Sequence, residues 1–376
     1  MNKCIFFIKK HTVLCIAALA AAVTCFIIPP DGEYLGYFDL RTLCCLFMTL
    51  AAVCALRNIK FFTIAARKTV MLAGSLRLLA VILTVMTFIG SMIIANDMAL
   101  ITFLPIGYFA LSVTKQEKHS AYIFIIQNIS ANLGGMLTPF GNPQNLYLYS
   151  KFNIPTGEFM GIMLAPFLLA ITMLIICCFF LPNEKLEIKE EFPDRLNKKR
   201  TAVYSVLFAL SILCVFRVLP SVFGIEPYFI CTAIMIVSLM WLDREALKSV
   251  DYPLLLTFTM FFIFSGNMSR MESVRNLMSG MLEKSTLLVS ALSCQCISNV
   301  PSAILLSGFT DNYRELLLGV NIGGTGTLIA SLASLITFSE YKLLYPGHGK
   351  RYFAMFTLIN FIFLAVMLTV SYFFFV

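Results

Sequence analysis

Polar and glycine-rich residues interrupt the long apolar runs of this chain at two pairs of matched positions. Residues 94–99 read Ile-Ala-Asn-Asp-Met-Ala, and residues 297–302 read Ile-Ser-Asn-Val-Pro-Ser. A glycine-rich segment follows each of them, at 132–145 and at 321–327. Unpaired backbone cannot face hydrocarbon, so such segments must be buried in protein or line a cavity. Interrupted apolar segments at corresponding places in two halves predict internal repeats with a transport site between them.

The composition is that of a membrane protein. Hydrophobic residues make up 59% of the chain and charged residues only 13%, and the mean hydropathy is +0.86. We therefore predict an all-α polytopic membrane protein with about 9 to 11 spans, in two inverted repeats that each carry a re-entrant hairpin and a broken helix. The hairpins are predicted at 73–113 and 285–309. The predicted spans are 11–29, 38–56, 120–149, 159–181, 202–219, 227–242, 252–268, 313–338 and 352–375.

The distribution of Lys and Arg residues predicts how the chain is oriented in the membrane. The net charge is +8, and most Lys and Arg residues fall on one side of the predicted topology, which is the cytoplasmic side by the positive-inside rule. The chain then divides into a first membrane repeat at 1–181, a cytoplasmic linker at 182–200, and a linking span plus the second repeat at 201–376. Because the linking span reverses the entry side, the second repeat is predicted to be inverted. This pattern argues against a nucleic-acid partner.

The residue types at the interruptions suit ions. Helix N-termini carry partial positive charge and free N–H groups, which favour an anion, whereas carbonyl, Asn and Ser/Thr oxygens suit a hard cation such as Na⁺. The candidate substrate- and ion-binding residues are Asn96, Asp97, Thr138, Gly141, Asn142, Pro143, Asn145, Ser298, Asn299, Pro301, Ser302, Gly324, Thr325 and Thr327. Candidate Na⁺ ligands among them are Asn96, Asp97, Asn142, Ser298 and Asn299.

Each candidate also has a structural interpretation. The two asparagines, Asn96 and Asn299, could simply cap helices, and the glycines could serve helix packing. Asp97 is the only acid between Asp39 and Glu117. A carboxylate at membrane depth is costly, so it should face a cavity, pair with a cation or titrate. Because its repeat counterpart is Val300, we favour a coupling role over a structural ion pair.

The motifs resemble those of a known group of transporters. Residues 94–97 with Thr102 and Pro105 resemble the first hairpin of bacterial arsenite-pump permeases. Residues 138–145 resemble the helix break of citrate, dicarboxylate and sodium–proton antiporter proteins, and residues 326–335 resemble the second break. The chain is thus similar to the ion transporter superfamily, in its citrate-carrier-like group, and also resembles divalent anion–sodium symporters. The resemblance implies a homodimer whose hairpin tips belong to a moving transport domain.

These features predict a secondary active transporter of a small anion, either a di- or tricarboxylate or an inorganic oxyanion, coupled to Na⁺ or H⁺. The expected location is the inner, cytoplasmic membrane as a multi-pass protein in contact with lipid, with no tightly bound cofactor. A sodium–proton antiporter and an arsenite or oxyanion exporter are the alternatives. A membrane enzyme is disfavoured because His11, His119 and His348 all fall at predicted cytoplasmic ends.

The charge asymmetry predicts which loops are reachable from each side. Single cysteines placed at Glu190 and Pro346, in a cysteine-free background, should react with an impermeant maleimide only from the cytoplasm. Cysteines at Pro155 and Glu272 should react only from outside. Labelling of positions 190 and 272 from the same side would contradict the inverted topology.

Overall fold

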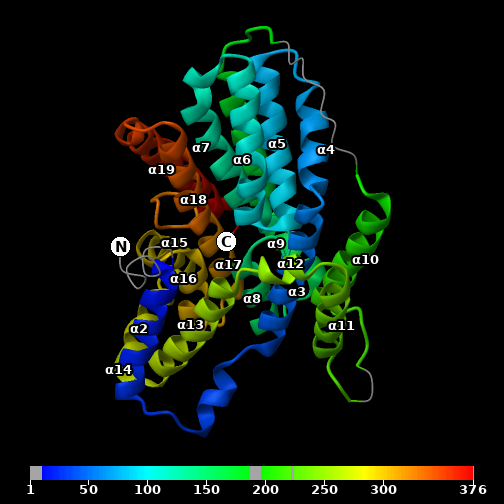
Figure 1. The fold of residues 1–376 in the computed structure, drawn as a ribbon. Coiled ribbons are helices and arrows are strands. Elements are labelled where there is room, and N and C mark those ends of the chain that lie inside the picture. The colour runs from blue at the N-terminus through cyan, green and yellow to red at the C-terminus, as the bar shows by residue number, and fades with distance from the viewer. Residues whose placement is uncertain (1–10, 187–195, 222–223, 376) are drawn as a thin grey trace.

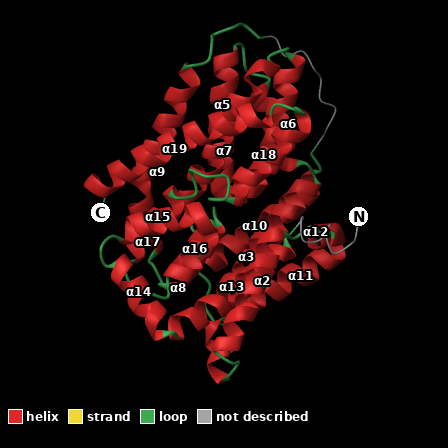
Figure 2. Ribbon diagram, turned by 90° about the vertical axis from the view of Figure 1, so that its left-hand side faces the viewer, coloured by secondary structure: helices red, strands yellow, loops and turns green. Residues whose placement is uncertain are grey.

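The computed structural model describes residues 11–186, 196–221 and 224–375, and these ranges are helical without a β-strand (Figures 1 and 2). The predicted all-α fold class is confirmed. The α-helices are α2 (Thr12–Ile27), α3 (Leu40–Asn58), α4 (Phe61–Val70), α5 (Leu76–Ile94), α6 (Asn96–Val113), α7 (Ser120–Gly134), α8 (Pro143–Lys151), α9 (Thr156–Phe179), α10 (Lys198–Val215), α11 (Pro227–Leu242), α12 (Arg244–Lys248), α13 (Tyr252–Arg270), α14 (Glu272–Leu282), α15 (Thr286–Ile297), α16 (Asn299–Leu306), α17 (Tyr313–Ile322), α18 (Leu332–Leu344) and α19 (Gly349–Phe374). Short 3₁₀ turns cover Gly32–Tyr37, Glu117–His119 and Gly135–Leu137.

The helices follow the same order in the two halves of the chain. In the first half a long helix (α3), a short helix (α4), a hairpin (α5–α6), a broken helix (α7–α8) and a terminal helix (α9) follow one another, and α13 to α19 repeat this order. The caps match as well. Asp39 and Asp251 accept hydrogen bonds from Thr42 N and Leu254 N at the starts of α3 and α13. Ser75 and Ser285 cap the first arms of the two hairpins. The opposite orientation of the two halves in a membrane stays a prediction.

Five helices of the described ranges are long and apolar enough to cross a membrane: α3, α5, α6, α9 and α19. The two arms of the first hairpin belong to this set, with 19 and 18 residues, whereas α15 and α16 of the second hairpin have only 12 and 8. A bilayer core of about 30 Å needs about 20 helical residues. Within the hairpin predicted at 73–113, α5 therefore has the length for a full crossing, whereas α15 of the second hairpin does not.

The broken helices cross over between the two halves. In Figure 2 α8, α16 and α17 lie together in the lower left part of the view, and α8 packs on both α16 and α17. Likewise α18, the second part of the other broken helix, packs on α6 and α7. Each break therefore sends its second helix against the hairpin of the other half. By contrast, α2 packs on α13, and α10 and α11 pack on α3 at the side of the molecule (Figure 1).

Two groups of polar loop residues lie at opposite ends of the chain's helices. At one, Glu184 accepts hydrogen bonds from Leu76 N and Gln116 Nε2 at 2.9 and 2.6 Å. At the other, Arg270 Nη2 binds Asp31 Oδ2 at 2.7 Å. That bond from Arg270 lowers the pKa of the Asp31 carboxyl. The first group joins segments that are predicted to be cytoplasmic, and the second joins segments that are predicted to lie outside.

Glycines allow close packing of the broken helices on the hairpins. A methyl group at Gly134 of α7 would overlap Phe88 O and Ser91 Oγ of α5. One at Gly323, just after α17, would lie 2.8 Å from Ala291 Cα of α15. The packing role considered for these glycines is therefore present at both breaks.

Gly134→Ala should lower the melting temperature of the purified protein, because overpacking at a helix contact costs about 1–3 kcal/mol. The matched control is Gly161→Ala in α9, where an added methyl group meets no atom within 4 Å. That control should be neutral or stabilising, since alanine is the better helix former. Equal melting temperatures for the two variants would contradict the close contact between α5 and α7.

Candidate substrate and ion site

Both hairpins turn at a single residue with the same unusual backbone conformation. Ala95 has φ 67° and ψ 155°, and Ser298 has φ 76° and ψ 159°. This region is normally occupied only by glycine, and other residues in it carry strain of order 1–3 kcal/mol. Such strain persists only where the surrounding structure enforces it, and it concentrates at functional sites. The tips are therefore equivalent at the level of a single residue, although one carries Ala and the other Ser.

The asparagine after each turn begins the second arm of its hairpin. Asn96 Oδ1 accepts from Asp97 N, and Asn299 Oδ1 accepts from Val300 N, both at 2.9 Å. Each asparagine is the first residue of its helix, and neither helix has a side-chain cap. The local bonds leave the Nδ2 groups for other partners. Asn96 Nδ2 donates to Asn132 Oδ1 at 3.4 Å. Ligation of an ion by these side chains stays a prediction.

The first break is held together by its own polar residues. Asn145 Nδ2 lies within 3.2 to 3.3 Å of three break carbonyls, those of Gly135, Met136 and Thr138. Thr138 Oγ1 donates to Met92 O in the first hairpin at 2.8 Å. Gly141 lies so close to Gly135 O that a side chain would not fit. The two N–H donors of a single amide are thus shared among the carbonyls that the missing helical turn leaves open.

At the second break, a glutamine from the hairpin bonds the free backbone groups. Gln295, in α15, donates from Nε2 to Gly323 O at 2.9 Å and to Thr325 O at 3.0 Å. Its Oε1 accepts from Thr327 N at 2.8 Å. The tip is also tied to this segment, because Asn299 N donates to Ala330 O at 3.0 Å. The second hairpin therefore holds the second break from outside the break.

Asparagine side chains join the two breaks to each other. Asn142 Nδ2 donates to Asn321 Oδ1 at 3.3 Å, and Asn321 Nδ2 donates to Asn145 Oδ1 at 2.6 Å. Asn142 also reaches Asn132 O at 3.4 Å. These four asparagines, here called the asparagine network, are each at most 3% exposed. Buried amide chains of this kind fix one arrangement, because breaking them leaves polar groups unpaired.

Three enclosed oxygen atoms at the first tip and first break have no hydrogen-bond partner in the structure: Asp97 Oδ1, Asn142 Oδ1 and Gln144 Oε1. The first two belong to residues predicted as Na⁺ ligands, and carboxylate and amide oxygens are the ligands that a hard cation prefers. A cavity of about 10 Å³ adjoins Ala95, Asn142 and Pro143. That volume admits about one water-sized particle. The residues that line this cavity are mostly apolar, with Thr49 and Asn142 as the polar ones, and Asp97 is not among them. The cavity is too small for a carboxylate substrate.

The structure brings most of the predicted residues into two groups around the asparagine network. The first group is Asn96, Thr138, Gly141, Asn142, Pro143 and Asn145, and the second is Ser298, Asn299, Gly324 and Thr327. Two predicted hydroxyls point elsewhere: Ser302 Oγ pairs with Ser293 Oγ inside the hairpin, and Thr325 Oγ1 donates to Ile322 O. Pro301 is the third residue of α16.

Three participants were missing from the predicted set: Asn132, Gln295 and Asn321. A signal for two of them exists, because Asn132 and Asn321 each stand two residues before a Gly-Gly pair. Gln295 has no such signal, since its partners come together only when α15 packs on α17. The polar cluster before the first break connects elements: Gln127 Nε2 donates to Thr87 Oγ1, and Asn128 Nδ2 to Thr337 Oγ1 of α18.

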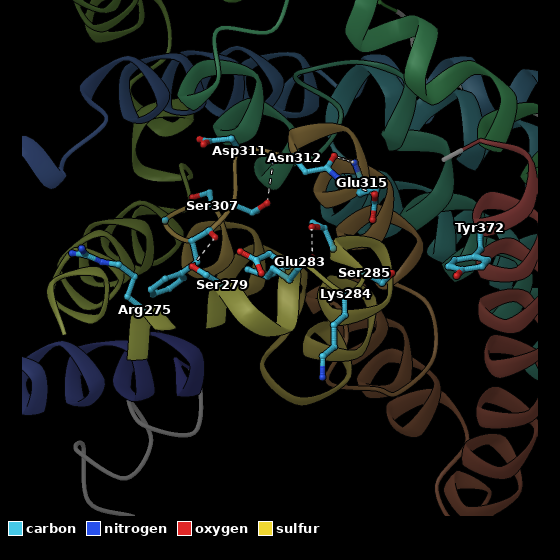
Figure 3. Close-up of a pocket in the computed structure, with 15 residues that line it drawn as sticks. Arg275, Ser279, Glu283, Lys284, Ser285, Ser307, Asp311, Asn312, Glu315 and Tyr372 are labelled. Atoms are coloured by element: carbon cyan, nitrogen blue, oxygen red, sulfur yellow. Dashed lines mark hydrogen bonds between the residues drawn. The ribbon is translucent and has the colours of Figure 1, made fainter. Parts of the chain in front are cut away.

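A larger polar cavity lies at the opposite end of the second hairpin from its tip. Its volume is about 770 Å³. Figure 3 shows Glu283 and Ser285 near the start of the hairpin and Asp311, Asn312 and Glu315 after its end. None of the predicted site residues lines it. It is wide enough to admit water to the base of the hairpin.

Gln295→Met should lower the melting temperature markedly, because methionine has similar length but cannot bond the break carbonyls, and each buried unpaired group costs about 1–3 kcal/mol. The control is Gln116→Met, which removes a hydrogen bond to the half-exposed Glu184 and should have little effect. A Gln295→Met protein as stable as the control would show that the second break does not depend on this amide.

Sequence comparisons agree with this architecture. A family profile described as citrate transporter matches residues 4–312, which include both hairpin tips and the first break. An uncharacterised transporter of Methanocaldococcus jannaschii is 34% identical over 307 residues, covering 81% of this chain and 82% of that protein. An inner membrane protein of Escherichia coli is 26% identical over 281 residues, covering 73% of each chain. The matches, together with the apolar helices, identify a multi-pass membrane transporter, and the chain belongs to the citrate transporter family.

Proposed function

We propose that this chain is a secondary active transporter of a small anion, a di- or tricarboxylate or an inorganic oxyanion, driven by Na⁺ or H⁺. The observation that carries the proposal is the convergence of the first hairpin tip and both helix breaks on one asparagine network. The second tip is tied to the segment after the second break. Polar backbone groups without helical hydrogen bonds raise the free energy of a protein in a membrane. Such groups are found where ions or substrates bind.

The helix ends supply the chemistry for an anion. Four helices, α6, α8, α16 and α18, begin at the tips or directly after the breaks. Their N-terminal N–H groups and partial positive charge favour a carboxylate or oxyanion. No basic side chain is needed for this, which suits a site that must release its substrate. The family description, citrate transporter, supports a carboxylate.

The unpartnered oxygens supply the chemistry for a coupling cation. Asp97 Oδ1 and Asn142 Oδ1 lie at the tip and break of the first half. An ion bound there would complete their coordination and neutralise Asp97, whose charge is costly at this depth. Binding of the cation would thus prepare the neighbouring helix N-termini for the anion. The sequence contains no Walker-type phosphate loop, and we assign the driving force to an ion gradient.

An elevator-type movement fits the division of helix contacts. One group packs around the hairpins and breaks, in which α8 contacts α16 and α17, and α18 contacts α6 and α7. The other group consists of α2 with α13, and α10 and α11 with α3, and the two groups meet where α13 packs on α16 and α3 on α8. We assign the first group to a moving transport unit and the second to a scaffold that forms a homodimer, placed in the cytoplasmic membrane. The E. coli relative, described as an inner membrane protein, supports that location.

A sodium–proton antiporter would use the same architecture without an organic substrate. Cation exchange usually requires several titratable carboxylates, and the predicted site offers chiefly Asp97. An oxyanion exporter differs from the leading proposal in substrate and direction. Uptake into proteoliposomes of dicarboxylates, citrate, sulfate and arsenite, with and without Na⁺ and pH gradients, separates the three.

Asn96→Ala and Asn299→Ala should each abolish uptake in that assay while leaving folded protein in the membrane. The matched control is Asn360→Ala, a buried asparagine whose Nδ2 bonds Phe356 O inside α19, and it should transport normally. Normal uptake by either tip variant would show that the asparagine at that tip has only a structural role.

A further inference from the structure

Arg217 stands just beyond the end of α10 and reaches across the boundary between the two groups of helices. Its Nη2 donates to Tyr149 O, in the last turn of α8, at 2.7 Å. The carbon of its guanidinium lies 4.6 Å from the centre of the Tyr149 ring. Since α10 belongs to the group assigned to the scaffold and α8 to the transport unit, one side chain connects the two groups through a charged hydrogen bond and a cation–π contact.

The charge of Arg217 suits the end of the helix that it contacts. The C-terminus of a helix carries partial negative charge, which favours a cation in its last turn. The ion pairs among the described residues do not include Arg217, and its guanidinium contacts this carbonyl and this ring. Arg217 also falls inside the predicted span 202–219, where a charged side chain is costly and points to a role in function.

The helix α8 connects this contact to the candidate site. Its 9 residues begin directly after the first break, and Asn145 in its first turn bonds the break carbonyls and Asn321. The Arg217 contact lies in its last turn. A helix of this length extends about 13 Å and moves as one piece. The scaffold therefore holds the asparagine network through α8.

The end of the other broken helix is bound within its own group instead. Tyr345, which follows α18, pairs its hydroxyl with Ser120 Oγ at 2.8 Å, and Ser120 begins α7. Both α18 and α7 belong to the transport unit. Because the helices otherwise follow the same order in the two halves, the repeat architecture alone does not require a contact from the scaffold at this place.

The contacts around Arg217 differ in how they respond to sliding. The ring of Phe140, in the first break, lies 6.5 and 5.7 Å from those of Phe208 and Phe216 on the α10 side. Apolar contacts of this kind are non-directional, whereas a hydrogen bond to one carbonyl weakens steeply when its geometry changes. Arg217 has φ 59°, which residues other than glycine rarely adopt, and its Nε is enclosed without a partner. These two features weaken the hold, as a contact that must open requires.

We propose that Arg217 is a positioning residue of the transport cycle, whose bond to Tyr149 O holds the transport unit in the position seen in this structure. The inference rests on the proposed function, in particular on its elevator-type movement. The bond breaks each time the unit moves along the scaffold and forms again on its return. Arg217 therefore sets how much of the protein occupies this position, without contacting the anion or the cation.

The test measures how fast one scaffold cysteine reacts with N-ethylmaleimide, in the full-length, otherwise cysteine-free protein in detergent. Thr49 of α3 lines the small cavity against Ala95 and Asn142 and is 8% exposed. A cysteine at Thr49 therefore reacts mainly when the transport unit has moved away. Arg217→Gln, which is too short to reach Tyr149 O, should speed this reaction about tenfold or more, since a hydrogen bond from a charged donor typically shifts an equilibrium by that factor.

The matched control is Arg275→Gln, which removes an arginine that bonds the carbonyl of Ser269 at 2.6 and 2.9 Å within the α13–α14 segment. It should leave the reaction rate at Thr49 unchanged. A second cysteine at Thr87, buried between α5 and α7 inside the transport unit, reports unfolding. Equal rates at Thr49 in Arg217→Gln and Arg275→Gln, or a parallel rise at Thr87, would overturn the proposal.

This measurement needs no substrate, so it separates the role of Arg217 from the proposed function. Faster reaction at Thr49 alone, in a protein that takes up none of the tested anions, keeps the role of Arg217 and rejects the anion transporter. An unchanged reaction in a protein that transports an anion keeps the transporter and rejects the role of Arg217.

Discussion

The fold depends on hydrogen bonds from side-chain amides to unwound backbone at membrane depth. Water cannot reach these carbonyls if they lie in hydrocarbon, and each one left unpaired costs several kcal/mol. Asn145 shares its two N–H donors among three carbonyls of the first break, and Gln295 bonds two of the second. Without these amides the carbonyls of the breaks would lose their side-chain partners. The site therefore exists because a few primary amides replace the missing helical bonds.

The backbone carbonyls of the two breaks are bonded by different residues in the two halves. Asn145 lies just beyond the break that it supports, whereas Gln295 reaches the second break from the hairpin helix. The second hairpin and second break are consequently bound as one piece. The first tip is attached to its break through Asn96 with Asn132 and Thr138 with Met92 O. Each hairpin is therefore bound to its own break, but by a different set of side chains.

Much of this arrangement could be predicted from local sequence. The tips occur at Ala95 and Ser298, inside the predicted interruptions, because a short Asn-containing motif within an apolar run permits a turn. The helices also break at the predicted glycines.

Tertiary features could not be predicted. The pairing of Asn142 and Asn145 with Asn321 joins residues about 180 positions apart, and it exists only because α8 packs on α17. The length of α5 and α6 relative to α15 and α16 also follows from packing, since apolar composition alone does not say where an arm ends.

The short second hairpin has a consequence for the electric field across the membrane. The 8 residues of α16 extend about 12 Å, less than half of a bilayer core of about 30 Å. In the proposed re-entrant arrangement, the polar cavity at the base of this hairpin would bring water and counter-ions into the remaining depth. The membrane potential would then fall over a thin septum around the tips rather than over the whole bilayer. An ion crossing that septum would experience nearly all of the about 2.3 kcal/mol per charge that 100 mV provides, so that a movement of a few ångströms would perform most of the electrical work of transport.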